Sequence, residues 1–323
     1  MNNRDADNKY VEVIGEICLD IIMHHPNSVE VLGEKLWAEN ITITPGGSVV
    51  FVSTVLAHLG ERVRIHGSLG DDEEGQKILR MLHTININCD GVTVLKDTNT
   101  TLSMIICDGA RKNFLGCSAM LPLIMPDINS LENTKLIYVA GFMLYQELWT
   151  AEGFAYFKRA HELGIPIVID GQCSGSESFD RNPDNFVSLE KTLTYCSVFF
   201  AAQKELSRLK HSPDGSAEAA QLLKTGLKTA VLKHGPNGAI AFESDGVYIS
   251  EGYQVDAYDA VGSGDIFGAA YTHGLMNGWP TGQCVEFANV FAALSILKYR
   301  ERKQYPSIKA VLKIIKEREL KHA

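Results

Sequence analysis

The chain has 323 residues and a formal net charge of −9 at pH 7, with 45% hydrophobic and 21% charged residues. This composition is ordinary for a globular protein, and the length allows one large α/β domain or two medium ones with a substantial core. The acidic balance argues against a protein that binds nucleic acid through a basic face, and no apolar run reaches the roughly 18 residues of a membrane span.

The first ten residues, MNNRDADNKY, are polar and mixed in charge. They show no basic segment followed by an apolar one, so they do not resemble a secretory signal. The seven cysteines are scattered and form no CxxC pair. This pattern is typical of reduced thiols and not of a disulfide framework. We therefore expect a cytoplasmic protein with no membrane or nucleic-acid partner.

Strand-like and helix-like segments alternate in the first part of the chain. Residues 11–17 predict a strand, and GGSVVFVSTVLAHLG (46–60) predicts a helix that Gly60 closes. Residues 62–70 predict a second strand. Residues 71–84 predict an amphipathic helix whose first turn carries acidic residues, where they oppose the helix dipole favourably.

Residues 91–114 are rich in β-forming side chains and have no helical pattern between them. A turn signal at Asp108-Gly109 predicts a hairpin, and we expect these strands to pair locally and antiparallel. With N-terminal segments they predict a small β-rich lid, formed from about 16–45 and 92–118. The exposed edges of such a lid could pair in a homodimer.

The alternation resumes at Leu136 and continues to the C-terminus. Further strands are expected at 136–140, 165–170, 197–201 and 229–235, and helices at about 146–163, 186–193, 214–225, 263–276, 281–298 and 306–320. Each connection between strands is long enough for a helical crossover, so the strands should lie parallel with helices on both faces. No linker divides the chain. The sequence predicts one domain over residues 1–323, with a three-layer α/β/α core, a mostly parallel sheet and the lid.

The segment DAVGSGDIFGAA changes from polar and turn-like to small and apolar at Gly262-Ser263-Gly264. Glycines at a loop-to-helix junction let a ligand approach the backbone, and the first turn of the helix offers N–H groups and a partial positive charge. Together these features predict an anion site. Asp265 stands in that first turn, where it is a candidate helix cap and a candidate general base.

Other glycine motifs fit this segment less well. The dinucleotide fingerprint GxGxxG would need glycine at position 267, where the chain has Phe267, and it belongs near the start of a βαβ unit. No GxxxxGK[ST] motif occurs. A nucleotide would therefore bind without a Walker loop, and a dinucleotide-dependent oxidoreductase is the weakest alternative.

The same segment resembles the C-terminal motif of the ribokinase-like (PfkB) carbohydrate kinases, roughly D-T-x-G-A-G-D-x-F. The matching residues are Asp259, Gly262, Gly264, Asp265 and Phe267. Companion segments resemble the same family and extend the resemblance from about Val11 to Ile315: VEVIGEICLD, PGGSVVFVSTVLAHLG, HGSLGDDEEGQKILRML, TAVLKHGPNGAIAF and FANVFAALSI.

The resemblance implies a ribokinase-like fold and an ATP- and Mg²⁺-dependent transfer of a phosphoryl group to a hydroxyl of a sugar or nucleoside-like molecule. Asp265 would be the general base, and Gly262, Ser263 and Gly264 would form the anion hole. The acceptor would lie between the core and the lid. The residues implied to bind it are Asp20, Gly46, Gly47 and Phe51.

The resemblance also implies sites for the nucleotide and for metal ions. The nucleotide would contact Lys233, His234, Gly235 and Asn289. Glu205 would help to organise Mg²⁺, through water. Asp259 and the carbonyl group of Val261 occupy positions that bind a monovalent cation such as K⁺ in some members of the family.

Two positions depart from the family pattern. Phe51 stands where many members have an asparagine that binds the sugar, and Ala202 replaces the asparagine of N-x-x-E, although Glu205 is kept. An altered acceptor with an apolar face would explain Phe51, as would a ring that fills the junction between lid and core. Reduced catalysis would explain both departures. A catalytically weak sensor of sugars or nucleotides is therefore the alternative to a kinase.

Overall fold

The computed structural model describes residues 9–24, 38–108, 111–118, 120–172, 183–210, 215–297 and 305–322. Its main sheet has nine strands in the order β13-β12-β11-β10-β9-β8-β1-β4-β5. Their bounds are β1 Tyr10–Gly15, β4 Val63–Gly70, β5 Asn88–Leu95, β8 Thr134–Ala140, β9 Ile167–Asp170, β10 Val198–Ala202, β11 Thr229–Lys233, β12 Gly238–Glu243 and β13 Gly246–Glu251. Every neighbouring pair in the run β11-β10-β9-β8-β1-β4-β5 is parallel, as the long connections predicted. The antiparallel hairpin of β12 and β13 closes one edge.

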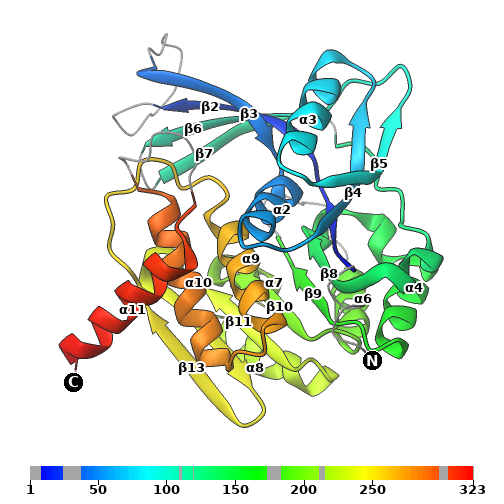
Figure 1. Cartoon of the computed structure of the whole chain (residues 1–323). Helices are drawn as coiled ribbons and strands as arrows, with labels where there is room; N and C mark the ends of the chain where they lie inside the picture. Colours follow the sequence, from blue (N-terminus) through cyan, green and yellow to red (C-terminus); the bar gives the residue numbers. More distant parts are fainter. Residues whose placement is uncertain are drawn as a thin grey trace.

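Helices cover both faces of this sheet (Figure 1). One face packs against α2 (Ser48–His58), α3 (Glu73–Thr84), α9 (Ser263–Met276), α10 (Thr281–Ser295) and α11 (Ile308–His322). The other face packs against α4 (Ala151–Glu162), α6 (Pro183–Leu193), α7 (Gln203–Lys210) and α8 (Ser216–Leu222). Successive strand side chains point to opposite faces, so Val13 of β1 joins the first core and Ile14 joins the second. The predicted three-layer architecture is confirmed.

The lid is a separate four-stranded sheet, at the upper left of Figure 1. Its order is β3-β2-β6-β7, with β2 Cys18–His24, β3 Asn40–Gly46, β6 Leu102–Asp108 and β7 Arg111–Cys117. The pairs β2–β3 and β6–β7 are antiparallel, while β2 and β6 are parallel. The β6–β7 pairing of Asp108 with Arg111 fits the predicted turn, although residues 109–110 lie outside the described residues, as do 25–37 of the first lid segment.

The predicted lid boundary at residue 92 was wrong. Residues 92–95 belong to β5, which pairs in parallel with β4 in the main sheet. The reason is that α3 precedes β5, so β4, α3 and β5 form a βαβ unit whose crossover brings β5 back beside β4. The connection from β5 to β6 has no helix because it leads out of the main sheet into the lid.

Helical starts also differ from the sequence prediction. The expected helix at 146–163 begins with a 3₁₀ segment, Gln146–Trp149, and α4 starts at Ala151 after its N-cap Thr150, whose hydroxyl accepts a hydrogen bond from Gly153 N. The other 3₁₀ segments are Ile128–Asn133, Phe142–Leu144, Leu223–Thr225 and Gly235–Asn237. Helix α7 and strand β13 were not predicted.

Candidate active site

The glycine turn that precedes α9 is closely packed on one side. Gly262 has φ 74° and is the N-cap of α9, a conformation that favours glycine. A β-carbon at Gly262 would lie 2.5 Å from Cδ1 of Phe51, so a side chain there would force the Phe51 ring to move. Gly264 has more room, since the nearest atom to a β-carbon would be Nζ of Lys233 at 3.4 Å. The turn therefore brings an ammonium group beside the N-terminal N–H groups of a helix.

Asp265 is buried in the first turn of α9, 8% exposed. Its Oδ1 accepts a hydrogen bond of 2.8 Å from Nε2 of Gln172, which follows β9. The same amide nitrogen donates to Oγ of Ser48, the first residue of α2. Gln172 thus links this carboxylate to the start of α2, and it is a site residue that the sequence analysis missed.

Lys233 ends β11 and forms an ion pair with Asp170 at the end of β9, with Nζ and Oδ2 2.6 Å apart. Asp170 is fully buried. The pKa of Asp170 is raised to about 7, because burial and the nearby carboxylates of Asp265 and Glu205 outweigh the lowering effect of the Lys233 ammonium. Asp170 was also missed. The sequence feature that could have indicated it is an acidic residue at the end of the apolar strand segment IPIVID.

Asp20 and the glycine pair Gly46-Gly47 come together at the base of the lid. Asp20 is 3% exposed and lies on β2, and a β-carbon at Gly46 would overlap its carboxylate. Gly47 has φ 81°, and a β-carbon there would lie 2.5 Å from the carbonyl oxygen of Glu16. The glycines therefore let β3 and α2 approach the strand that carries Asp20.

Glu16 adds a third carboxylate to this region. Its pKa is raised from 4.5 to about 7, mainly by burial and in the same direction by the charges of Asp20 and Asp265. The three acidic residues therefore interact electrostatically across the site. Glu16 was not among the predicted site residues, although it lies in the quoted strand VEVIGEICLD.

Phe51 lies in α2 and is 8% exposed. Its ring belongs to a small apolar cluster with Ile22 and Ile105 of the lid, Cys107 and Val261. The ring also covers Gly262 of the glycine turn. Phe51 thus packs where the lid, α2 and the turn meet, which agrees with the interpretation that it fills this junction. Whether it also touches an acceptor stays a prediction.

Apart from Lys233, the predicted nucleotide residues lie in the turn after β11 and in α10. His234 and Gly235 form the turn after β11, and Gly235 has φ 58°. Asn289 donates through Nδ2 to Oγ of Ser250 and to the carbonyl of Glu251, which ties α10 to β13. These contacts give Asn289 a structural role in addition to the predicted one, and nucleotide binding by these residues stays a prediction.

The predicted metal residues all take part in local hydrogen bonds. Oε2 of Glu205 accepts from Ala202 N at 2.7 Å, the reciprocal half of a capping box that starts α7. Oδ1 of Asp259 accepts from Val261 N at 2.8 Å. Within the described part of the chain, no group of three or more His, Cys, Asp or Glu side chains is arranged to hold a metal ion. Mg²⁺ and K⁺ at these positions therefore stay predictions.

Comparison with known proteins decides the family. Residues 8–307 match the profile of the pfkB family carbohydrate kinases. The chain belongs to the pfkB family. It is thus a carbohydrate kinase of the phosphotransferase class with a ribokinase-like fold. The match covers nearly the whole chain, and the family assignment made from the glycine turn and its companion segments is confirmed.

Several known proteins are similar to this pfkB kinase over nearly its whole length. It is 23% identical to a 5-dehydro-2-deoxygluconokinase of Geobacillus thermodenitrificans over 94% of this chain and 91% of the relative. The fold is similar to that of Arabidopsis thaliana ribokinase complexed with ribose and ATP, with TM-score 0.73, 20% identity, and 95% and 99% of the two chains covered. It is also similar to a protein from E. coli provisionally named Ribokinase II, in complex with ATP and Mg²⁺, with TM-score 0.76, 19% identity, and 96% and 99% covered.

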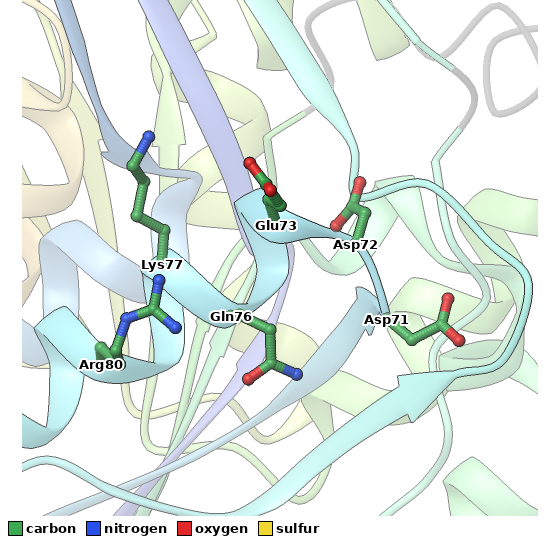
Figure 2. Close-up of a pocket in the computed structure, with 6 residues that line it drawn as sticks. All are labelled: Asp71, Asp72, Glu73, Gln76, Lys77 and Arg80. Carbon is green, nitrogen blue, oxygen red and sulfur yellow. The ribbon is translucent and has the colours of Figure 1, made fainter.

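A surface pocket of about 430 Å³ lies elsewhere in the pfkB kinase, at the start of α3 (Figure 2). Its lining residues are Asp71, Asp72, Glu73, Gln76, Lys77 and Arg80. Two of its carboxylates have structural partners, because Asp71 accepts from Thr98 N and Asp72 accepts from Gly75 N and from Thr100. The pocket contains none of the predicted site residues.

No helix in the described ranges has the length and apolar character needed to cross a bilayer.

Proposed function

We propose that this pfkB kinase transfers the γ-phosphoryl group of ATP to a hydroxyl of a sugar or nucleoside-like small molecule, with Asp265 as the general base. One observation carries the proposal: a buried carboxylate and a lysine ammonium flank the same glycine turn at the start of a helix. A base for the acceptor hydroxyl and positive groups for the phosphoryl oxygens are the two requirements of this reaction.

The proposed step is an in-line displacement. The acceptor oxygen forms a bond to the γ-phosphorus while the bond from that phosphorus to the bridging oxygen of ADP breaks, and the electron pair of that bond leaves with ADP. The hydroxyl proton passes to a carboxylate oxygen of Asp265. The N–H groups of the turn at Gly262–Gly264, together with the ammonium of Lys233, stabilise the charge on the transferred group.

The residues present fit a magnesium ion that the nucleotide phosphates and water hold, because Mg²⁺ keeps several waters and needs few protein carboxylates. Glu205 is the proposed protein contributor, through water. Its Oε2 accepts a hydrogen bond from Ala202 N, and its charge raises the pKa of Asp170, the ion-pair partner of Lys233. When bound, Mg²⁺ neutralises phosphate charge. We also propose that Asp259 and the carbonyl group of Val261 bind a monovalent cation such as K⁺.

On the acceptor side, we propose that Asp20 and the backbone of Gly46 and Gly47 bind hydroxyl groups. The support is their convergence beneath the lid, with Asp265 close enough for its charge to raise the pKa of Glu16 beside Asp20. We further propose that residues 1–323 act as a single domain in the cytoplasm, where the six described cysteines would stay reduced.

We also propose a homodimer formed through the lid. The register of β2, β3 and β6 aligns Ile43, Ile21 and Met104 in one row on the outer face, and Ile43 and Met104 are 61% and 48% exposed. Ile41 extends this apolar face along β3. Burial against a second copy would remove this face from water. An Ile43→Lys variant that leaves the mass in light scattering unchanged would contradict the dimer.

The proposed function is tested by measuring ATP consumption with a panel of sugars, sugar acids and nucleosides. We expect at least one acceptor to be phosphorylated, and Asp265→Asn to lower kcat by about 10²–10⁴-fold while the fold survives. Asp256→Asn, at an exposed position before the turn, is the matched control and should keep full activity. Tight ATP or sugar binding without turnover on any acceptor would instead favour the sensor.

A further inference from the structure

Gln172 has a backbone conformation that its residue type rarely adopts. Its φ is 48°, in the left-handed region. Among the described residues, two other non-glycine residues have positive φ, Asn86 and Asp97, and both lie in exposed turns. Asparagine and aspartate tolerate this region, whereas glutamine has no local hydrogen bond that compensates. Such strain persists where the surroundings fix it, and it is concentrated at functional sites.

The surroundings of Gln172 fix its amide in one orientation. Nε2 donates to Oδ1 of Asp265 at 2.8 Å and to Oγ of Ser48. On the other side of the amide, Gly141 leaves room for Oε1, because a β-carbon at Gly141 would lie 2.9 Å from that oxygen. The amide therefore lies between α2, the β8 exit and α9, with its nitrogen toward the carboxylate.

The amide donor of Gln172 lies in an acidic environment. Glu16 and Asp20 are acidic and their charges interact with each other, and the charge of Asp265 also acts on Glu16. Like charges close together favour the protonated form of a carboxyl group, which cannot accept a proton. A neutral amide donor favours the ionised form and adds no positive charge that would cancel the base.

We propose that Gln172 is a positioning residue, which holds Asp265 ionised and oriented toward the acceptor hydroxyl. The inference rests on the proposed function, because it assigns Asp265 the role of base. Gln172 acts through Asp265 and needs no contact with the substrate. Ser48 supports it by accepting from the same nitrogen, and Gln172 makes both contacts from a backbone in the left-handed region.

Two substitutions at this position separate catalysis from stability. Gln172→Glu keeps the shape and replaces the donor with a carboxylate next to Asp265. We expect kcat to fall by about 10-fold or more and the acidic limb of its pH profile to move up by about one unit, with KM for ATP nearly unchanged. Gln172→Gly relieves the backbone strain and removes the amide, so its melting temperature should equal or exceed that of the wild type while kcat still falls.

The controls make each outcome decisive. Gln221→Glu introduces the same charge change on the exposed surface of α8 and should leave kcat and its pH profile unchanged. Wild-type kcat and pH profile in both Gln172 variants would overturn the proposal, and so would losses of kcat that only accompany a lower melting temperature. A wild-type enzyme that phosphorylates no acceptor would instead reject the proposed function, and the role of Gln172 would fall with it.

Discussion

The ammonium nitrogen of Lys233 lies 2.6 Å from Oδ2 of Asp170, and it is also the nearest atom to the position of a β-carbon on Gly264. One buried carboxylate thus holds a cation at the edge of the glycine turn. Asp170 is the last residue of β9 and Lys233 is the last residue of β11, and β10 lies between these two strands. Both residues therefore lie at the carboxyl edge of the parallel sheet. This is the edge at which open α/β sheets bind ligands.

The pair allows the catalytic role of Lys233 to be separated from its structural role. Lys233→Met leaves Asp170 buried without its cation, and the free energy of unfolding should fall by roughly 2–4 kcal/mol. The kcat should fall by about 10²-fold or more, because a group that stabilises the transferred phosphoryl charge is lost. Denaturant unfolding and steady-state kinetics measure the two effects.

The double variant Lys233→Met/Asp170→Asn is the matched control, because it removes both charges. We expect most of the lost stability to return while kcat stays low. If kcat returned with stability, Lys233 would be a purely structural residue, and the cation at the turn would have no part in phosphoryl transfer.

Gly264 can be replaced without a clash, and this makes it a clean probe of the anion site. The nearest atom to the position of its β-carbon is Nζ of Lys233 at 3.4 Å, an ordinary contact, so the fold should accept Gly264→Ala, and Gly264→Val adds two methyl groups at the same point. A side chain at this position would stand where phosphate approaches the backbone. Calorimetric affinity for ATP should fall from glycine to alanine to valine while the melting temperature changes little. Unchanged affinity in both variants would place the nucleotide elsewhere.

The sequence predicted the parts of this site that depend on local pattern. The start of α9 at Ser263 follows from a glycine turn before an apolar helix, and the structure brings Asp20 and Gly46, which the family resemblance implied as acceptor residues, into contact. Gln172 could not be predicted in the same way, because a glutamine in the left-handed region has no local signal. Its conformation is fixed by contacts with two residues more than ninety positions away in sequence.

Buried charges were also difficult to predict from sequence. Glu205 looked like a metal residue alone, but the structure adds a helix-capping contact with Ala202 N. Asp170 looked like the end of a strand, and its partner arrives from β11, two strands along the sheet. The assignment of residues 92–95 to the lid was wrong for a related reason, since pairing depends on the crossover that precedes a strand and not only on the connection that follows it.

Glu16 should make stability depend on pH. Its pKa in the folded protein, about 7, lies above the ordinary 4.5, so folding favours its protonated form. The stability that this group contributes is therefore complete below pH 4.5 and is lost as pH rises toward 7. Urea unfolding should show a loss on the order of 3 kcal/mol from this group between these limits, at about 1.4 kcal/mol per pKa unit.

Glu16→Gln removes that titration, so the variant should gain stability relative to the wild type at pH 8 and show a flatter profile between pH 5 and 8. Glu152→Gln, on the exposed start of α4, is the control and should follow the wild-type profile. Parallel profiles for wild type and Glu16→Gln would mean that folding does not raise the pKa of Glu16.

Phe51 is the departure from the family pattern for which the structure offers a physical reason. Its ring packs with Ile22 and Ile105 of the lid and covers Gly262. Phe51→Asn should leave a polar group and a cavity at this junction, with a loss of about 3 kcal/mol or more of stability, whereas Phe51→Leu keeps the cluster apolar and should cost less. Melting temperatures of the two variants measure this difference.

A substrate panel on the same variants distinguishes packing from recognition. If Phe51 only fills the junction, Phe51→Asn lowers stability but leaves the order of preferred acceptors unchanged. If the ring also stacks on an apolar or aromatic face of the acceptor, an interaction of about 0.5–1.5 kcal/mol beyond burial, the variant weakens that acceptor and improves simple sugars such as ribose or fructose. A plain hexose as the best acceptor of the wild type would contradict stacking, because its hydroxyl groups match asparagine better than a phenyl ring.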